Sequence, residues 1–367
     1  MKNLYILTFG LLLLTACGNT DSSTEQAAPA VDSLANPLIY PQEVHFKNMR
    51  QLTFGGDNAE AYWSFGNDML VFQATNPQWG VSCDQIYVMK MNGERLDSVP
   101  PLRVSTGLGR TTCAFFMPGD STFIYASTHL ANDSCPPVPE RKAGRYVWPI
   151  YNTYDIFEAD LNGNIIRQLT NSESYDAEAT VSPKGDKIVF TSMRSGDLEL
   201  YTMNIDGSDL RQITSDLGYD GGAFFSPDGS KLIWRASRPK TDEEIAKYKG
   251  LLSEGLVEPT NMELFVANVD GSEMRQLTQL GKANWAPYFH PSGEKVLFAS
   301  NHASEAGFPF NIYMINLDGS GLEQITFDGA FDSFPMFSFD GKYLAFSSNR
   351  NNGRTRNTNM FIAEWVD

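Results

Sequence analysis

RQLTNSESYDAEATVSPKGDKIVFTSMRSGDLELYTMNIDGSDLRQIT, residues 167–214, begins and ends with one four-residue motif, and its two copies are 44 residues apart. Between them lie three short apolar runs, at 177–183, 187–192 and 198–204, each with the length and the β-branched or aromatic content of a strand. The turn sequences PKGD and IDGS follow the first and third runs, and Asp-Gly is a strong hairpin signal. The stretch therefore predicts a unit of four antiparallel strands.

The same motif recurs along the chain. Its six copies are RQLT at 50, RVST at 103, RQLT at 167, RQIT at 211, RQLT at 275 and EQIT at 323, spaced by 53, 64, 44, 64 and 48 residues. The spacing of 44 residues defines the uninterrupted unit, and the longer spacings indicate insertions. Asn-Gly or Asp-Gly also closes the third run in five units, starting at 92, 162, 206, 270 and 318.

Four antiparallel strands repeated about every 44 residues are typical of β-propeller blades. The chain opens with an isolated strand of the fourth type near Arg50 and ends after a strand of the third type at 359–366. The N-terminal strand can therefore complete the last blade and close the ring, which removes exposed sheet edges. We predict an all-β fold, a six-bladed β-propeller of four-stranded blades; a solenoid would need capping repeats, and none is visible.

The sequences YTMNIDGSDLRQIT (201–214) and FFSPDGSKLIW (224–234) carry a family resemblance. They resemble the TolB-like (PD40, WD40-like) propeller repeats, and the likeness extends over about 46–367. Such repeats occur in the periplasmic protein TolB of the Tol system and in propellers attached to S9-type peptidases, so the resemblance implies the fold and not one function. Two departures from TolB are expected: this chain has only a tether where TolB has an α/β domain, and it looks lipid-anchored.

The N-terminus has the pattern of a secretory signal peptide. Lys2 is followed by an apolar run at 4–14, which is short for a transmembrane helix, and then by the sequence LTAC ending at Cys17. These last residues resemble a bacterial lipobox, in which the cysteine is lipidated; an ordinary signal cleavage before Cys17 is the alternative. Gly18 after the cysteine favours the outer membrane over the inner one. The sequence does not decide which side of that membrane the protein faces.

The chain accordingly divides into three parts. The segment that follows Cys17 is rich in Ser, Thr, Ala, Asp, Asn and Pro without periodicity, a composition that cannot bury a core. We expect a signal peptide at 1–16, a flexible tether at 17–41 and the propeller at 42–367.

Composition limits the partners. Hydrophobic residues make up 42% and charged residues 20% of the chain, which are ordinary globular values. Lys and Arg number 28 against 44 Asp and Glu, a net charge of −16, whereas nucleic-acid and polybasic membrane contacts need a basic surface. We therefore expect an envelope protein or peptide as partner, no nucleic acid, membrane contact only through the lipid anchor, and a monomeric propeller.

The long insertions all fall between the second and third strands of a unit, and they lie at 76–84, 129–154, 238–261, 301–310 and 349–359. In an antiparallel blade these loops lie on one face, which in repeat proteins is usually the binding face. The 129–154 insertion combines prolines and aromatic residues with the basic residues Arg141, Lys142 and Arg145, and reads either as a docking arm or as a loop packed over the propeller mouth. The 238–261 insertion predicts a helix that begins with a Thr241–Glu244 capping box.

Two sets of polar residues occupy equivalent positions in the units. One enters the innermost strand and the other ends the second strand, so both are expected to ring the central funnel on the insertion face. They either brace the blades or bind a peptide or small polar ligand. The first set is Asn58, Thr111, Asp176, Asp220, Asn284 and Asp332, with Glu60 and Glu178 two residues further on; the second is Asn76, His129, Arg194, Arg238, His302 and Arg350.

Three cysteines follow Cys17, and an oxidising compartment permits one disulfide among them. Cys83 and Cys135 lie in neighbouring insertions on one face and form the favoured pair, with Cys113 as the alternative partner. No cysteine or histidine spacing of the zinc type is present.

The sequence favours a non-catalytic, lipid-anchored scaffold for an envelope protein or peptide, without cofactor or metal. Binding energy would come from the aromatic residues Trp79, Tyr146, Trp148 and Trp285. The sequence has no G-x-S-x-G elbow, no H-E-x-x-H motif and no phosphate-binding glycine loop. Two alternatives stay open: a carbohydrate-binding propeller, and a metal-dependent polysaccharide lyase or hydrolase, as in oligogalacturonate-lyase-like propellers, using His129, His302, Glu60 and Glu178.

Overall fold

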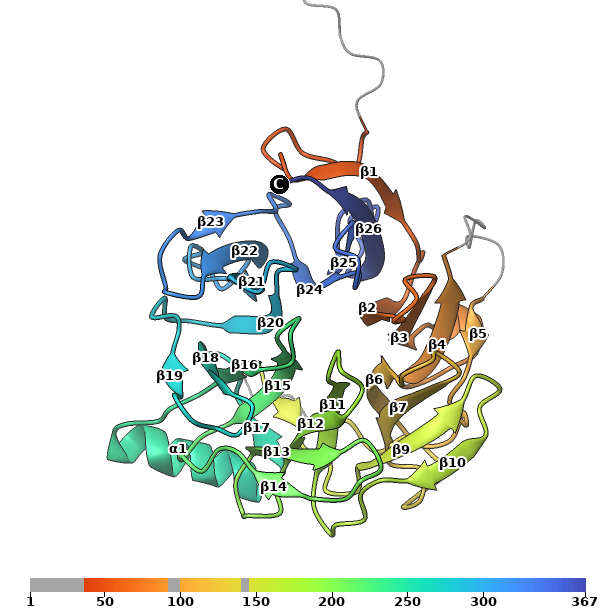
Figure 1. Cartoon of the computed structure of the whole chain (residues 1–367), viewed down its shortest axis with the longest axis vertical. Coiled ribbons are helices and arrows are strands. Elements are labelled where there is room, and N and C mark those ends of the chain that lie inside the picture. Colours follow the sequence, from red (N-terminus) through yellow and green to blue (C-terminus); the bar gives the residue numbers. More distant parts are fainter. Residues whose placement is uncertain (1–35, 92–99, 140–144) are drawn as a thin grey trace, which may run out of the picture. The chain divides into compact units, whose positions relative to one another are not determined.

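The computed structural model describes residues 36–91, 100–139 and 145–367, so the expected signal peptide, Cys17 and most of the expected tether lie outside the described residues. The folded unit, Asn36–Asp367, contains six four-stranded antiparallel sheets arranged around one axis (Figure 1). The predicted six-bladed propeller is therefore confirmed. Over the described ranges, no helix has the length and apolar character needed to cross a membrane.

Each blade runs from an inner strand beside the axis to a short outer strand. The first three blades are β2 (Asp57–Trp63), β3 (Met69–Thr75), β4 (Gln85–Lys90) and β5 (Leu102–Arg103); β6 (Thr111–Phe116), β7 (Thr122–Ser127), β9 (Asp155–Asp160) and β10 (Ile165–Gln168); and β11 (Asp176–Val181), β12 (Lys187–Ser192), β13 (Glu199–Asn204) and β14 (Arg211–Gln212).

The other three blades follow the same order. They are β15 (Asp220–Phe225), β16 (Lys231–Ala236), β18 (Glu263–Asn268) and β19 (Arg275–Gln276); β20 (Asn284–Phe289), β21 (Lys295–Ser300), β22 (Asn311–Asn316) and β23 (Glu323–Gln324); and β24 (Asp332–Phe337), β25 (Tyr343–Ser348), β26 (Asn359–Trp365) and the N-terminal β1 (Phe46–Gln51).

The ring closes through the last blade, where β1 pairs antiparallel with β26 as the sequence predicted (Figure 1). The segment before β1 adds to this closure: the Tyr40 hydroxyl donates to Asp328 at 2.7 Å, and Arg350 donates to the Leu38 carbonyl at 2.9 Å. The folded unit thus begins at Asn36 and not at residue 42, because residues 36–41 have packing partners on the last blade.

The motif RQLT recurs because one hydroxyl residue performs the same structural task in every blade: the last residue of the motif in five blades, and Ser105, the third residue of RVST, in blade 1. The hydroxyl accepts a hydrogen bond from a backbone N–H of the third strand, so a hydroxyl side chain holds the outer strand to its neighbour. The six pairs are Thr53 with Met360, Ser105 with Ile86, Thr170 with Ile156, Thr214 with Leu200, Thr278 with Leu264 and Thr326 with Ile312, at 2.8–3.0 Å.

The SPDG turns, like the RQLT motif, are stabilised by hydrogen bonds within one blade. In blade 4 the Ser226 hydroxyl donates to Asp228 and accepts the backbone N–H of Lys231, while Gly229 adopts a left-handed φ of 67°. Glycine takes this conformation without a steric penalty. These turns lie on the face opposite the insertions.

Large side chains fill the axis at the level of the middle of the inner strands. Tyr62 of blade 1 stacks with Phe224 of blade 4, 6.0 Å between ring centroids, and Phe224 contacts Tyr288 of blade 5 at 5.2 Å. Blades 1 and 4 lie on opposite sides of the ring, so this contact crosses the axis. It forms a floor beneath the insertion-face half of the funnel.

The insertions contribute the remaining elements. A short 3-10 helix, η1 (Pro77–Trp79), lies in the first insertion, and α1 (Asp242–Ser253) begins with the predicted Thr241–Glu244 capping box. Strand β8 (Trp148–Pro149) of the 129–154 insertion pairs with β17 (Leu256–Val257) of the 238–261 insertion. This pairing joins the insertions of blades 2 and 4.

Candidate functional site

Each inner strand carries one β-bulge near its start, and the bulges form a ring around the axis. The bulge residue is the third residue of the inner strand in blades 2–6 and the fourth in blade 1, and it has a left-handed backbone with φ between 41° and 61°. The six residues are Glu60, Cys113, Glu178, Gly222, Ala286 and Phe334. Five carry side chains in a conformation that costs energy, a feature common at functional sites.

This ring is chemically asymmetric. Blades 1–3 contribute Glu60, Cys113 and Glu178, whereas blades 4–6 contribute Gly222, Ala286 and Phe334. A polar half therefore faces an apolar half across the axis. The sequence alignment that paired Glu60 with Glu178 contained the signal for the other four positions, but they share no chemistry that would have pointed to them.

A cavity of about 290 Å³ lies between this ring and the insertions. Eleven aromatic and five charged side chains contribute to its wall, the charged ones being Glu60, Asp84, Arg110, Glu178 and Arg235. The volume suits a small molecule or one chemical group of a larger partner.

Glu178 and Arg235 form the most extensively bonded pair in this cavity. The Glu178 carboxylate accepts from Arg235, from the Tyr219 hydroxyl at 2.8 Å, from Thr191 at 2.7 Å and from the Gly222 N–H at 3.0 Å. Burial alone raises its pKa, but the charge of Arg235 and these hydrogen bonds outweigh burial and hold the pKa of Glu178 below its ordinary value. Glu178 is therefore a fixed anion.

Arg235 occupies the position that a bulge side chain would take in blade 4. A Cβ on Gly222 would lie 1.7 Å from Nη1 of Arg235, so glycine is required there. The guanidinium lies over the rings of Tyr219 and Trp148, 5.0 and 5.3 Å from their centroids. Sequence reasoning missed Arg235 and Tyr219, because their meeting with Glu178 of the neighbouring blade is a tertiary contact.

Glu60 has a different environment. Its Oε2 accepts from the Tyr62 hydroxyl at 2.9 Å and from the Cys113 thiol at 3.0 Å. Burial raises the pKa of Glu60 above its ordinary value, although the hydrogen bonds from Cys113 and Tyr62 act against this rise. In the described part of the chain it makes no ion pair within 4 Å, unlike Glu178 and Asp84.

The 129–154 insertion forms the roof. Trp148 contacts Trp285 of blade 5 at 5.2 Å between centroids and lies over Arg235 of blade 4. Tyr146 contacts both tryptophans and is 53% exposed. Because blades 2 and 5 lie on opposite sides of the axis, this segment crosses the funnel, which is the packed-loop alternative of the two considered. Arg141 and Lys142 lie outside the described residues.

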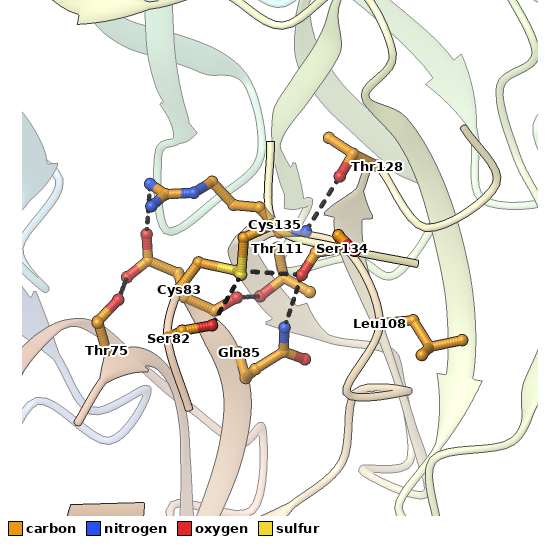
Figure 2. The surroundings of a disulfide bond; sticks show 12 residues. Thr75, Ser82, Cys83, Gln85, Leu108, Thr111, Thr128, Ser134 and Cys135 are labelled. Carbon is orange, nitrogen blue, oxygen red and sulfur yellow. Dashed lines mark hydrogen bonds and ion pairs between the residues drawn. A yellow bond between two sulfur atoms is a disulfide. The ribbon is translucent and has the colours of Figure 1, made fainter. Parts of the chain in front are cut away.

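A disulfide joins Cys83 of the first insertion to Cys135 of the second, the pair that the sequence favoured (Figure 2). It ties the start of the roof segment to blade 1. Directly after Cys83, Asp84 forms an ion pair with Arg110 at 3.0 Å, and both line the cavity. Cys113 keeps a free, buried thiol.

Most of the other proposed funnel residues lie inside the blades, and the expectation that they ring the funnel was wrong. Asp176, Asp220 and Asp332 are fully buried and pair with Arg194, Arg238 and Arg350 of the same blades, at 2.9, 2.7 and 3.1 Å. None of the six lines the cavity. They brace the insertion-face end of blades 3, 4 and 6, since burying the aspartate requires a cationic partner within reach.

The two histidines follow the same rule of matched charges. In blades 2 and 5 the inner position holds uncharged Thr111 or Asn284, and the partner position holds His129 or His302 instead of arginine; blade 1 has Asn58 and Asn76 at these positions. Each ring is hydrogen-bonded to a serine of its own blade at 2.9 Å, and burial lowers the pKa of both imidazoles. They do not meet Glu60 or Glu178, and within the described ranges no three His, Cys, Asp or Glu side chains converge as metal ligands.

Of the four aromatic candidates, three line the cavity and one packs in a blade. Tyr146, Trp148 and Trp285 line the cavity. Trp79 instead packs against Tyr87 of blade 1, 5.0 Å between ring centroids, and belongs to the blade core. The aromatic wall is completed by residues that the sequence did not single out, chiefly Tyr151, Tyr154, Tyr175 and Tyr219.

Comparison with known proteins agrees with this architecture. The model of the PD40 family, the TolB beta propeller domain, matches residues 150–254. A putative TolB from Agrobacterium tumefaciens is 19% identical with a TM-score of 0.55, over 85% of this chain and 91% of that one. TolB from Acinetobacter baumannii is 16% identical with a TM-score of 0.54, over 82% of this chain and 64% of that one.

A more distant likeness is to an oligogalacturonate lyase in complex with manganese, 12% identical with a TM-score of 0.48, over 87% of this chain and 93% of that one. No curated protein sequence matches the chain significantly. The two likenesses to TolB structures, both below 25% identity, establish the TolB-like propeller fold alone.

Proposed function

We propose that this TolB-like propeller is a non-catalytic binding protein of the cell envelope, which receives a protein or peptide on its insertion face. The central cavity takes one group of that partner. The observation that carries the proposal is the aromatic-roofed cavity at the centre of the face that bears every long insertion.

Exposed apolar side chains on the insertions support a macromolecular partner. Leu130, Val138 and Tyr146 of the second insertion and Phe308 of the fifth blade are 63%, 70%, 53% and 65% exposed. Aromatic anchors that surround a pocket are typical of protein–protein contact sites. The cavity itself is too small for more than a side chain, a chain end or a small molecule.

Four of the five charged groups of the cavity favour binding over chemistry. Glu178 and Arg235 are held by each other, as are Asp84 and Arg110. Such groups fix the orientation of a ligand, whereas a general acid or base must exchange a proton with it. Stacking of a sugar on Trp148 or Trp285 is the second candidate, since both rings line the cavity.

Photo-cross-linking tests the binding face. A photoreactive residue placed at Tyr146 or Phe308 of the full chain is expected to capture one envelope protein or peptide in living cells, because both side chains are exposed on the insertions. The same residue at Lys342, an exposed position on the opposite face, serves as the control. Equal capture from position 342, or none from 146 and 308, contradicts the proposal.

The proposed location depends on Cys17. We expect Cys17→Ser to abolish incorporation of labelled fatty acid and to release the protein from the membrane fraction, since the thiol is the acceptor of the lipid in the lipobox reading. Cys113→Ser is the matched control, because its thiol is buried in the propeller. Persistence of the label in the Cys17→Ser protein would show that the lipoprotein assignment is wrong.

A further inference from the structure

The cavity has an unbalanced charge, and this imbalance bears on the group that it receives. Three carboxyl groups, Glu60, Asp84 and Glu178, line it together with two guanidinium groups, Arg110 and Arg235. Asp84 pairs with Arg110 and Glu178 with Arg235, so among the residues that the structure describes Glu60 is the carboxyl group of the cavity that makes no ion pair. When Glu60 is ionised the cavity carries one net negative charge.

Glu60 is held in place and oriented by its neighbours. The Tyr62 hydroxyl and the Cys113 thiol both donate to Oε2, whereas Oε1 has only a long contact of 3.4 Å from the Gln73 amide. A carboxylate that accepts two hydrogen bonds on one oxygen keeps lone pairs free on the other. The strained bulge at φ 56° fixes this side chain in the ring that lines the cavity.

We propose that the cavity binds an alkylammonium group, with the Glu60 carboxylate as its counter-ion and the aromatic wall as its surroundings. This inference rests on the proposed function and names the group of the partner that enters: a lysine side chain or an N-terminal amine. A free small amine presents the same chemistry.

The charge of the cavity, its aromatic wall and its apolar half all favour an alkylammonium group. A cation neutralises the one uncompensated carboxylate, whereas an anion would add a second negative charge to a buried site. Aromatic rings attract ammonium groups through their electron-rich faces, and eleven aromatic side chains line the wall. The apolar half, with Ala286 and Phe334, can receive the alkyl chain that carries the ammonium group.

The test compares charged and neutral probes of one size. Ligand-observed NMR with the full chain measures Kd for butylammonium and for butanol, and for a capped Gly-Lys-Gly peptide and its form acetylated on the lysine side chain. We expect each cation to bind roughly 10-fold or more tightly than its neutral counterpart. If the lysine peptide binds and butylammonium does not, a protein partner is the source of the ammonium group. If both bind, the site also accepts free amines.

The matched variants are Glu60→Gln and Glu273→Gln. Both residues are glutamates with a left-handed backbone, at φ 56° and 55°, but Glu273 is exposed on an outer turn. Glu60→Gln is expected to weaken the cations roughly 10-fold or more while leaving the neutral probes unchanged; Glu273→Gln should change neither. Ala286→Leu fills the apolar half without touching Glu60, and it should also weaken binding of the cations. Thermal melts of each variant show whether a folding defect accounts for a loss of binding.

Two results would overturn the inference: neutral probes that bind as tightly as their charged counterparts, or no binding by either cation. If cross-linking from positions 146 and 308 still captures a partner, only the ammonium assignment fails. If that capture fails as well, the proposed function fails with it.

Discussion

Arg350→Ala is expected to lower the free energy of unfolding by about 3–5 kcal/mol, because removing one member of a buried ion-pair network leaves its partners unpaired. The Arg350 guanidinium is 2% exposed and binds both oxygens of Glu43, at 2.9 and 3.0 Å, together with Asp332 at 3.1 Å. Glu43 and Asp332 are themselves fully buried in their side chains. Urea denaturation followed by tryptophan fluorescence measures the change.

This network also fastens the N-terminal segment to the last blade. Arg350 therefore links the two ends of the ring, and its loss is expected to make residues 36–45 more susceptible to limited proteolysis. Arg211→Ala is the control: its pair with Asp209 is exposed, with 67% of the arginine side chain accessible, and such pairs contribute about 0–1 kcal/mol. A loss below about 1 kcal/mol in Arg350→Ala, similar to the control, would show that ring closure does not depend on this residue.

Glu199→Gln is expected to stabilise the protein at alkaline pH by ~2–4 kcal/mol and to change it little at pH 5. Glu199 begins β13, is 3% exposed and has an Oε2 without a hydrogen-bond partner in the described part of the chain. Burial raises its pKa from 4.5 to about 8, and the neighbouring charges of Asp220 and Asp197 add to the rise.

The direction of this pH dependence follows from the numbers of protons that the folded and unfolded chains bind. Below pH 4.5 the Glu199 carboxyl is protonated in both the folded and the unfolded chain. Between pH 4.5 and about 8 the folded chain holds a proton that the unfolded chain releases, so the stability of the wild-type protein falls as the pH rises. Above about pH 8 both are ionised and the full penalty of the buried charge remains.

Denaturation at pH 5, 6, 7, 8 and 9 tests this expectation in the wild-type and Glu199→Gln proteins. Asp220, whose pKa burial raises to about 6, contributes a slope in both proteins at the acidic end, so the difference between the two proteins above about pH 7 is the measure of Glu199. The exposed Glu273→Gln provides the control for the substitution itself. Parallel stability curves for wild type and Glu199→Gln would show that Glu199 is already ionised at neutral pH in the folded protein.

Much of the sequence repeats because the same stabilising contacts recur within the blades. The threonine of RQLT, the serine and aspartate of SPDG and the matched Asp–Arg pairs stabilise single blades through contacts within one repeat. The charge match could have been found in the sequence, because Asp176, Asp220 and Asp332 each precede an arginine by 18 residues. His129 and His302 occur in two of the three blades that lack that aspartate, which argues that they replace structural arginines.

The cavity, in contrast, consists of residues with different chemistry at equivalent positions. Glu178 meets Arg235 of the next blade, and Trp148 reaches Trp285 on the opposite side of the ring. A repeat pattern identifies positions that are alike, so it drew attention to the shared aspartates and arginines that brace the blades. It gave no signal for Tyr219 or Arg235, whose importance depends on their contact with Glu178 of the neighbouring blade.

The sequence by itself determined the six-bladed architecture, the closure of the ring by the N-terminal strand and the face that carries the insertions. It could do so because strand alternation, tight turns and the hydroxyl of RQLT act over a few residues and return with each repeat. Only the tertiary structure decided that the roof crosses the funnel, that Glu60 makes no ion pair with the described residues of the cavity, and that the proposed histidines remain apart. Those features depend on distances between blades, which are set by how the blades pack around the axis and not by spacing along the chain.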